Sequence, residues 1–532
     1  MIGIGVKISL AGSTSSFDAD ASAFFARVTA AGGTLSATEQ TATNQLVIDM
    51  KTNGIWSSMK AIYPMVGASA AACAQNLKSS SFTGTFSSGW TFASTGATPN
   101  GTSAFMDSTL IPSTSLASNN FSCGYYSNLN IASTSSNTGE IGIFQSAFQM
   151  IGVSLRRSLN SDNFIADGYG QSILISGNAN SDFFGIESRT STTSLKLWKN
   201  NVLSGTNTST DLGIRPTISI TIGKMNGLTG FSNRRCAFAY VSDGLTDTEV
   251  GNFYTNVQTF NQTLNRQVGA QIVSDADAQA YINRVYTAGG TLTNTEANAV
   301  NQLTIDMKAA GIWTAMKAVY PMVGASAAAC AQNLKSSSFT GTFSSGWTFA
   351  STGVTPNGTS AYMDTGLNPS LQTNFISNNH QSFYSRTQTP SGGNMWNIGV
   401  GYAPTGSPLF GLAVVRSGNN AIYDSGYYLT ARITSTQTDG RAFWLGTCNA
   451  SNSRKFVKNG SVIATNTATD IIAASNGNIA IGGLYDTSTS SVNYFSTQQC
   501  AFSSIGDSLT DAQASAFYTN VQNFNTTLSR QV

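Results

Sequence analysis

The chain has little charge and almost no histidine. Only 27 Lys and Arg and 25 Asp and Glu occur in 532 residues, so 10% of the chain is charged where a globular domain typically has about 25%. A net charge of +2 gives no strong field for nucleic acid or acidic lipid, and Arg156-Arg157 and Arg234-Arg235 are pairs and not patches. His380 is the only histidine. Counting therefore excludes an HExxH metal site and a His-based triad in each half of the chain.

Neither the cysteines nor the apolar runs indicate a disulfide framework, a metal site or a membrane segment. A disulfide framework or zinc site would repeat with its unit, but Cys123 and Cys448 have no counterpart in the repeat described next, and no CxxC spacing occurs. We therefore predict free, mostly buried thiols and no bound metal or cofactor. No stretch approaches 18 apolar residues, and the N-terminus places Lys7 inside its apolar run without a basic segment before it. This predicts neither a membrane span nor a signal peptide.

The dominant positive feature is an internal repeat. Residues 63–96 return letter for letter as residues 320–353. The match extends from DADASAFF at Asp18, which returns as DADAQAYI at Asp275, to the closing FYTNVQTFNQTLNRQV, which returns as FYTNVQNFNTTLSRQV ending at Val532. The chain is one unit used twice, and any function must suit a tandem.

The pattern within each copy predicts three parts. Helical signals open each copy, short runs of β-formers broken by Gly, Asn and Ser follow, and a helix closes it. We predict an N-terminal arm (1–16), a helical segment (17–68), a sandwich (69–268), a linker (269–274), a second helical segment (275–325) and a second sandwich (326–532). The fold class is mainly β, with two tandem antiparallel β-sandwich units.

Helix starts carry capping boxes, in which a Ser or Thr and the third following Glu or Gln satisfy orphan amides. Four such boxes begin at Ser36, Thr246, Thr293 and Thr510. A short helical piece is expected from Trp56 to Tyr63. It should end there because Pro64 disfavours helix at the residue before it.

The strand region contains one strong turn signal. Asn459-Gly460 between RKFV and SVIA predicts a type I′ hairpin, since both residues readily take positive φ. Asn200-Asn201 is a weaker turn at the same place in the first copy.

These motifs resemble a known family of sandwiches. GWTFASTGATPNGTSAFMDS (89–108), the Asn-Gly hairpin and IGDSLTDAQASAFYTNV (505–521) are similar to the concanavalin A-like, laminin-G-like jelly roll. Together with the prelude DADAxAF…IDMKxxGIWxxMKAxYPMVG, they resemble virion structural and fibre proteins of tailed phages, especially those of Bacteroidetes (crAss-like phages among them). The resemblance implies a jelly-roll fold and a place on a virion. Sandwiches of this family often bind glycans or calcium at loop ends, but no such ligand set is recognisable here.

Gly506-Asp507-Ser508-Leu509 spells the signature of a serine esterase family. That chemistry needs a histidine base, and no histidine follows the motif. We interpret it as the turn and cap before the last helix. We align His380 with Phe121 of the first copy and expect a structural role.

Carboxylates need one further consideration, because glycoside hydrolysis requires only two acids. Most acids kept in both copies lie at expected helix starts or turns, where they cap amides. Asp107 and Asp364 fall in the sandwich and are the pair of most interest, although a turn role is favoured. The kept pairs are Asp18/Asp275, Asp20/Asp277, Glu39/Glu296, Asp49/Asp306, Asp107/Asp364, Asp243/Asp507 and Asp247/Asp511.

Aromatic residues offer a different kind of candidate. Trp56, Trp90, Trp313 and Trp347 could stack sugar rings, but their apolar surroundings favour core packing.

The sequence thus predicts a non-enzymatic virion surface protein: a head fibre, decoration protein or tail-associated fibre. It would be made in the bacterial cytoplasm and displayed on the particle, anchored by the arm. Expected partners are capsid, portal, tail or fibre proteins, further copies of the chain and a host surface glycan. The alternatives are a receptor-binding lectin with a true glycan site and a polysaccharide depolymerase. Binding specificity is expected in the diverged regions, roughly 105–235 and 362–499, on loops of the sandwiches.

Overall fold

The computed structural model describes residues 17–132, 137–158, 162–388, 393–402, 408–416, 418–425, 431–469 and 474–532. The chain separates into two compact units, the first ending at Gly269 and the second beginning at Ala270. The expected N-terminal arm, residues 1–16, lies outside the described residues. In the described part of the chain, no helix has the length and hydropathy to cross a bilayer.

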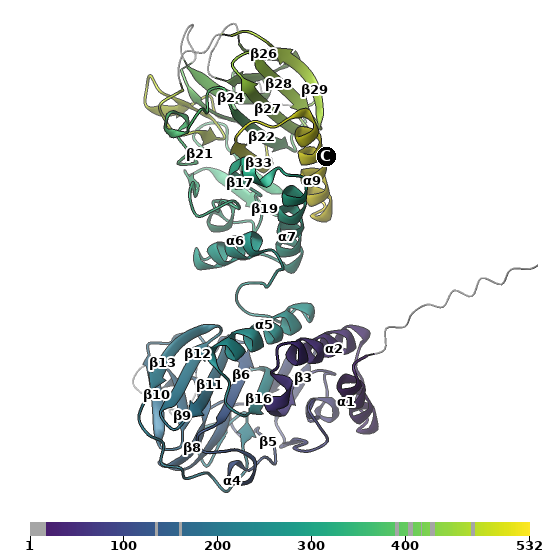
Figure 1. Cartoon of the computed structure of the whole chain (residues 1–532), viewed down its shortest axis with the longest axis vertical. Helices are drawn as coiled ribbons and strands as arrows, with labels where there is room; N and C mark the ends of the chain where they lie inside the picture. Colours follow the sequence, from purple (N-terminus) through teal and green to yellow (C-terminus); the bar gives the residue numbers. More distant parts are fainter. Residues whose placement is uncertain are drawn as a thin grey trace, which may run out of the picture. The chain divides into compact units, whose positions relative to one another are not determined.

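Unit 1 contains two sheets of mainly antiparallel strands (Figure 1). The first has the order β13 (Val202–Asn207), β12 (Ser194–Lys199), β11 (Phe184–Ser191), β6 (Phe121–Ser127), β16 (Cys236–Ser242), β4 (Gly96–Pro99), β3 (Trp90–Ala93), with β1 (Met59–Tyr63) also paired to β16. The second has the order β10 (Gln171–Ser176), β9 (Asp162–Gly168), β8 (Gln149–Ser158), β7 (Ile141–Ser146), β14 (Thr221–Ile222), β5 (Met106–Asp107), β2 (Thr85–Phe86), with β15 (Met225–Asn226) parallel to β7.

Unit 2 repeats this topology strand for strand and adds one short strand. Its first sheet has the order β19 (Trp347–Ala350), β20 (Gly353–Pro356), β33 (Cys500–Gly506), β22 (Asn379–Ser385), β27 (Ala442–Ala450), β28 (Ser453–Lys458), β29 (Ser461–Asn466), with β17 (Met316–Tyr320) paired to β33. Its second has the order β18 (Thr342–Phe343), β21 (Met363–Asp364), β30 (Ala480–Ile481), β23 (Ile398–Gly401), β24 (Leu409–Arg416), β25 (Asn420–Ser425), β26 (Ile433–Thr436). The added strand, β32 (Ser491–Asn493), pairs with β31 (Leu484–Asp486), which runs parallel to β23.

The closing helix of each unit, α5 (Asp247–Thr263) or α9 (Asp511–Thr527), packs on one face of the first sheet (Figure 1). In unit 2, Phe517 and Val521 of the closing helix pack on Phe443 and Phe502 of that sheet. Between the two sheets of each unit lies a hydrophobic core, which in unit 2 is separate from the cluster under the helices. The other long helices are α1 (Ala19–Ala30), α2 (Ala37–Thr52), α6 (Ala276–Thr287) and α7 (Asn294–Ala309). The short ones are η1 (Trp56–Ser58), α3 (Ala70–Cys73), α4 (Pro112–Ser115), η2 (Trp313–Ala315), α8 (Ala327–Cys330) and η3 (Pro369–Leu371).

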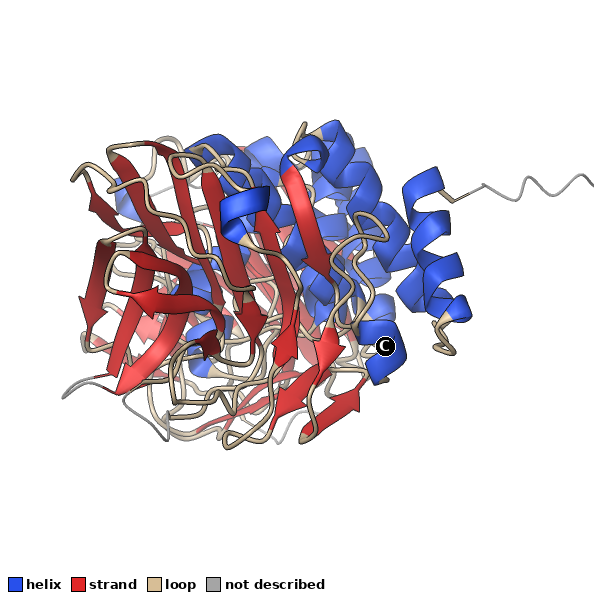
Figure 2. Cartoon of the chain, turned by 90° about the horizontal axis from the view of Figure 1, so that it is seen from below, coloured by secondary structure: helices blue, strands red, loops and turns tan. Residues whose placement is uncertain are grey.

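The predicted fold class, mainly β with tandem antiparallel sandwiches, is confirmed (Figure 2). All four predicted capping boxes are present, at the starts of α2, α5, α7 and α9. The hairpin between β28 and β29 has the predicted positive φ at both Asn459 (48°) and Gly460 (77°). All six cysteines are free and buried, as predicted.

The predicted helical piece from Trp56 to Tyr63 is wrong. Only Trp56–Ser58 is helical, as a single 3-10 turn, and Met59–Tyr63 is strand β1. The strand is held by a ladder with β16, in which Tyr63 pairs with Ala239. A partner about 180 residues away in the sequence therefore overrides the local helical preference.

A buried arginine near the end of each copy joins three parts of its unit. Arg266 follows α5, and its guanidinium donates to the carbonyls of Pro64 (2.6 Å), Met65 (2.8 Å) and Ala237 (2.8 Å). Its Nε donates to Asn261 Oδ1. Arg530 makes the same four bonds in unit 2, to Pro321, Met322, Ala501 and Asn525. We name this the arginine clamp.

We predict that Arg530→Lys destabilises unit 2 by about 3 kcal/mol, because a lysine cannot satisfy three carbonyls and an amide oxygen at once. Calorimetry of the full chain should show one unfolding transition lowered, and Arg266→Lys should lower the other. The control is Arg441→Lys, at an exposed ion pair with Asp439, which should leave both transitions where they are in the wild type. If Arg441→Lys lowered stability as much as Arg530→Lys does, a special role for the clamp would be contradicted.

Candidate functional site

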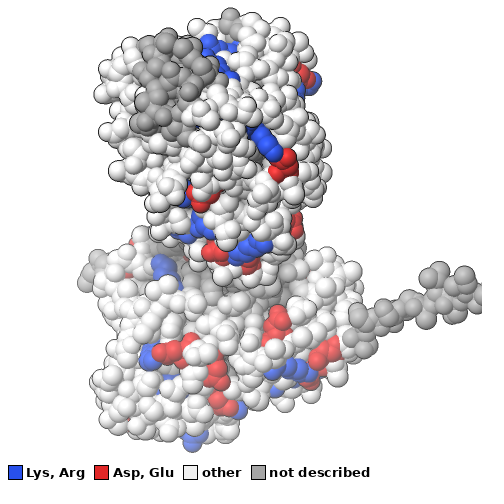
Figure 3. Space-filling model, turned by 45° about the horizontal axis from the view of Figure 1, so that its top comes forward, with Lys and Arg blue, Asp and Glu red and all other residues white. Residues whose placement is uncertain are grey.

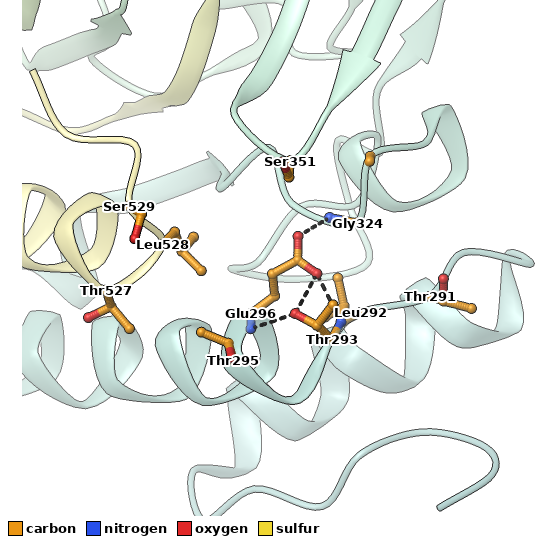
Figure 4. A pocket seen from close by; sticks show the side chains of 11 residues that line it. Thr291, Leu292, Thr293, Thr295, Glu296, Gly324, Ser351, Thr527, Leu528 and Ser529 are labelled. Carbon is orange, nitrogen blue, oxygen red and sulfur yellow. Dashed lines mark hydrogen bonds between the residues drawn. The ribbon is translucent and has the colours of Figure 1, made fainter. Parts of the chain in front are cut away.

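A cavity of about 480 Å³ opens at the start of α7 in unit 2 (Figure 4). Four segments build it: the first turn of α7, the loop after β17, the turn between β19 and β20, and the end of α9. Its lining residues are Thr291, Leu292, Thr293, Thr295, Glu296, Gly324, Ala325, Ser351, Thr527, Leu528 and Ser529. We name it the cap pocket, because the capping box of α7 forms one of its walls.

Unit 1 contains the same cap pocket, with a volume of about 580 Å³. Eleven equivalent positions line both pockets, and only two of them differ: Ser36 corresponds to Thr293, and Asn265 to Ser529. The lining residues of unit 1 are Thr34, Leu35, Ser36, Thr38, Glu39, Gly67, Ala68, Ser94, Thr263, Leu264 and Asn265.

One carboxylate is fixed in the wall of each pocket. Glu296 Oε2 accepts from the backbone N (2.9 Å) and Oγ1 (3.0 Å) of Thr293, and Oε1 accepts from Gly324 N at 2.9 Å. Glu39 makes the same contacts with Ser36 and Gly67 in unit 1. Glu296 is only 8% exposed. The capping box thus holds an acidic acceptor in one orientation.

The structure brings His380 to the GDSL turn, but not to its serine. His380 is fully buried. Its Nδ1 donates to the carbonyl oxygen of Asp507 at 2.5 Å, and its Nε2 accepts from Ser504 Oγ at 3.0 Å. Ser508 Oγ instead donates to Asn378 Oδ1 at 2.7 Å. The motif is therefore a turn before the cap of α9, and His380 is not placed to act as a base for Ser508.

The alignment of His380 with Phe121 is wrong by one residue. His380 pairs with Gly506 in the β22–β33 ladder, as Ser122 pairs with Ser242 in the β6–β16 ladder. The equivalent of His380 is therefore Ser122, one residue along from the expected position.

His380 fills space that a tyrosine fills in unit 1. Tyr240 Oη and Ser122 Oγ lie 2.6 Å apart, and the Tyr240 ring lies over Gly124. In unit 2 the equivalents of Tyr240, Ser122 and Gly124 are Ser504, His380 and Ser382. A ring on one strand has been exchanged for a ring on the neighbouring strand, which keeps the volume of the core.

The acids kept in both copies have structural partners. Asp18 and Asp20 both contact Lys51, Asp275 and Asp277 contact Lys308, and Asp49 and Asp306 accept from Gln45 and Gln302. The later pairs, Asp243/Asp507 and Asp247/Asp511, contact lysines. Asp107 and Asp364 accept from the backbone N of Thr109 and Gly366, each at 2.8 Å, as turn residues do.

The tryptophans are packed as predicted. Trp56 and Trp313 are each 9% exposed, and Trp90 and Trp347 pack against the sandwich cores. Among the described residues, no group of three or more His, Cys, Asp or Glu side chains is arranged to hold a metal ion.

Sequence reasoning missed the cap pockets. It placed binding specificity in the diverged sandwich loops, whereas both pockets are built from copied segments. The one available signal was the repeated Thr-Leu-x-x-Thr-Glu at residues 34–39 and 291–296. It was interpreted only as a helix cap, because the other walls are distant in the sequence.

A comparison with protein-family models finds no match, and a comparison with curated proteins finds none either. Similar solved structures include domain 4 of an extracellular arabinanase from Geobacillus stearothermophilus in complex with arabinotriose (11% identity, 37% of this chain and 98% of that chain, TM-score 0.28). The binding domain of botulinum neurotoxin serotype D (12%, 40% and 52%, 0.26) and a mutant Trypanosoma rangeli sialidase displaying trans-sialidase activity (10%, 71% and 61%, 0.31) are also similar. The chain spans about half the length of the botulinum structure. At these scores the likenesses carry no argument about what this chain does.

Exchanging the ring in unit 2 should change how stability depends on pH. Burial lowers the pKa of His380 to about 4 from an ordinary value of 6.5. Between these values the unfolded state binds a proton that the folded state excludes, so the contribution of His380 to stability falls as the pH falls from 6.5 to 4. The loss reaches about 3 kcal/mol below pH 4.

The variant that transplants the unit 1 arrangement, His380→Ser/Ser382→Gly/Ser504→Tyr, should lose this dependence. Burial raises the pKa of Asp424 to about 6, which stabilises unit 2 over nearly the same window as the pH falls. That effect is common to the wild type and the variant and cancels in their difference. Denaturant unfolding at pH 7 and pH 4 measures the difference, and a pH-independent difference would contradict the assignment.

Proposed function

We propose that the chain is a non-enzymatic bacteriophage virion surface protein, a head fibre, decoration protein or tail-associated fibre, that presents two sandwiches for particle assembly and attachment to host surface glycans. The observation that carries the proposal is the duplication of one complete fold with its pocket. A chain that repeats a binding surface gains from having two of them, because the second contact forms at high effective concentration.

The polar groups of the fold support a binding role over a catalytic one. The single histidine is buried on strand β22, and the kept acids cap helices, close turns or contact lysine or glutamine side chains. A nucleophile, a base and a place for the reacting atom must meet in an open site, and His380 contacts Ser504 in the core instead.

The surface supports the placement on a particle. Figure 3 shows small groups of charged side chains, several of opposite sign side by side, on a face made mostly of uncharged residues. Such a surface has no strong field for nucleic acid. The resemblance of the sequence motifs to those of tailed-phage fibre proteins is what suggests a virion. The proposed partners are capsid, portal, tail or fibre subunits and further copies of the chain.

The cap pockets favour the alternative of a receptor-binding lectin. This alternative differs from the virion surface protein only in that glycan binding would be the main function. The depolymerase alternative would need Asp107 or Asp364 as an acid, yet both are used in turns.

Antibodies raised against the purified chain should label intact particles of the source phage in negative-stain images, at regular positions on the head or the tail. Antibody absorbed beforehand with the purified chain is the control and should not label. Chain that is made in infected cells but absent from purified particles would refute the virion assignment.

A further inference from the structure

We propose that the two cap pockets are binding sites for a neutral sugar residue. The proposal rests on the proposed function and names its site and ligand class. Each cavity, of about 480 or 580 Å³, lies within the range of pockets that take small ligands.

Residues with uncommitted hydroxyl groups line each cavity. Thr291, Thr295 and Ser351 come from three different places in unit 2 and are all exposed. Within the described chain, their hydroxyls form no hydrogen bond. Thr34, Thr38 and Ser94 repeat this in unit 1. Hydroxyls both donate and accept, as the hydroxyls of a sugar do.

The fixed carboxylate supplies a directional acceptor. Glu296 receives three hydrogen bonds, and a carboxylate has about four acceptor positions. Its Oε1, bonded only to Gly324, retains a free position. The capping box keeps the oxygen in place, so a ligand hydroxyl meets an acceptor that loses little entropy on binding.

Apolar side chains complete the cavity. Leu292 and Leu528 line it in unit 2, and Leu35 and Leu264 in unit 1. They offer a surface for the C–H face of a sugar ring, while the hydroxyls meet its edges. Apolar walls with a few placed polar groups are typical of small-molecule sites.

Charge selects the class of sugar. The residues that line the pockets include one carboxylate and no Lys, Arg or His. The nearby clamp residue Arg266 is buried and donates to three carbonyls and Asn261. An anionic ligand would therefore meet a carboxylate without a free cation. The pockets should take neutral sugars and reject sialylated or uronic ones.

The test uses the full chain and a panel of neutral oligosaccharides built from glucose, galactose, mannose and N-acetylglucosamine. Lactose and 3′-sialyllactose form a matched pair within the panel. We expect binding of at least one neutral oligosaccharide with a Kd in the millimolar range by NMR titration at up to about 10 mM ligand. Addition of sialic acid to a sugar that binds should weaken binding about tenfold or more.

Ser94→Trp and Ser351→Trp fill the pockets from exposed turn positions. The double variant should lose binding about tenfold or more, and each single variant should lose mainly the avidity for a sugar-coated surface. Ser80→Trp and Ser337→Trp are matched controls, because these exposed serines lie in the same copied region outside the pockets. Glu39→Gln/Glu296→Gln should weaken binding while the helices stay capped, as Gln513 caps α9.

The outcomes separate the site from the function. Glycan binding that survives in the double tryptophan variant would overturn the cap pockets and leave a glycan-binding virion protein. Equal binding of a neutral sugar and its sialylated form would overturn the neutral class. Binding of no neutral saccharide by the wild type would overturn the pocket and the glycan part of the function, while particle labelling would still decide the virion assignment.

Discussion

The buried guanidinium of the arginine clamp, Arg266 in unit 1 and Arg530 in unit 2, joins the loop, sheet and helix on which the rest of each unit depends. Arg266 bonds to the loop after β1, to β16 and to the end of α5. Burial lowers its pKa to about 10, which leaves it charged at neutral pH. The loop contains Met65 and Ala68 at φ of 49° and 44°, conformations that cost a non-glycine residue about 1 kcal/mol or more. Arg266 binds the loop through the carbonyls of Pro64 and Met65, and Glu39 binds it through the backbone N of Gly67. Gly67 and Ala68 of this loop line the cap pocket, so the shape of the pocket depends on the two residues that hold the loop.

The two interiors show how much a fixed backbone can absorb. Arg189 of β11 is paired with Leu195 of β12 in unit 1, while in unit 2 Cys448 is paired with Arg454. The arginine thus stands on the neighbouring strand of the same sheet in unit 2. Its guanidinium still donates to the equivalent backbone carbonyl, that of Thr192 in unit 1 and Ser451 in unit 2. Like the exchange of the aromatic ring, this is a pairwise change that leaves the ladder in register. The protein thus conserves the position of a group and not the residue that carries it.

The sequence was sufficient for the features that depend on neighbouring residues. The four capping boxes and the Asn459-Gly460 hairpin need only a few residues in order, and they were predicted correctly. Strand β1 was not, because its ladder partner β16 is distant in the sequence. The His380 alignment failed for a related reason: the register of β22 is set by β33 and not by local pattern. The cap pocket combines both limits, since its helix start was predicted as a cap but its other walls come from remote segments.

The pattern of change between the copies bears on whether the pocket is merely inherited. Residues 63–96 are copied verbatim, and a recent copying event would explain Gly67, Ala68 and Ser94. It would not explain Thr34, Thr38 or Thr263, which lie outside that stretch. Thr38 and its equivalent Thr295 are exposed. Positions within two residues of them differ between the copies: Ala37 corresponds to Asn294, and Gln40 to Ala297. Exposed positions ordinarily tolerate substitution with little effect on stability, whereas here buried Tyr240 and Arg189 were exchanged and the exposed hydroxyls were kept. Stability alone does not require a hydroxyl at Thr38, so the retained pocket lining points to a contact made outside the chain.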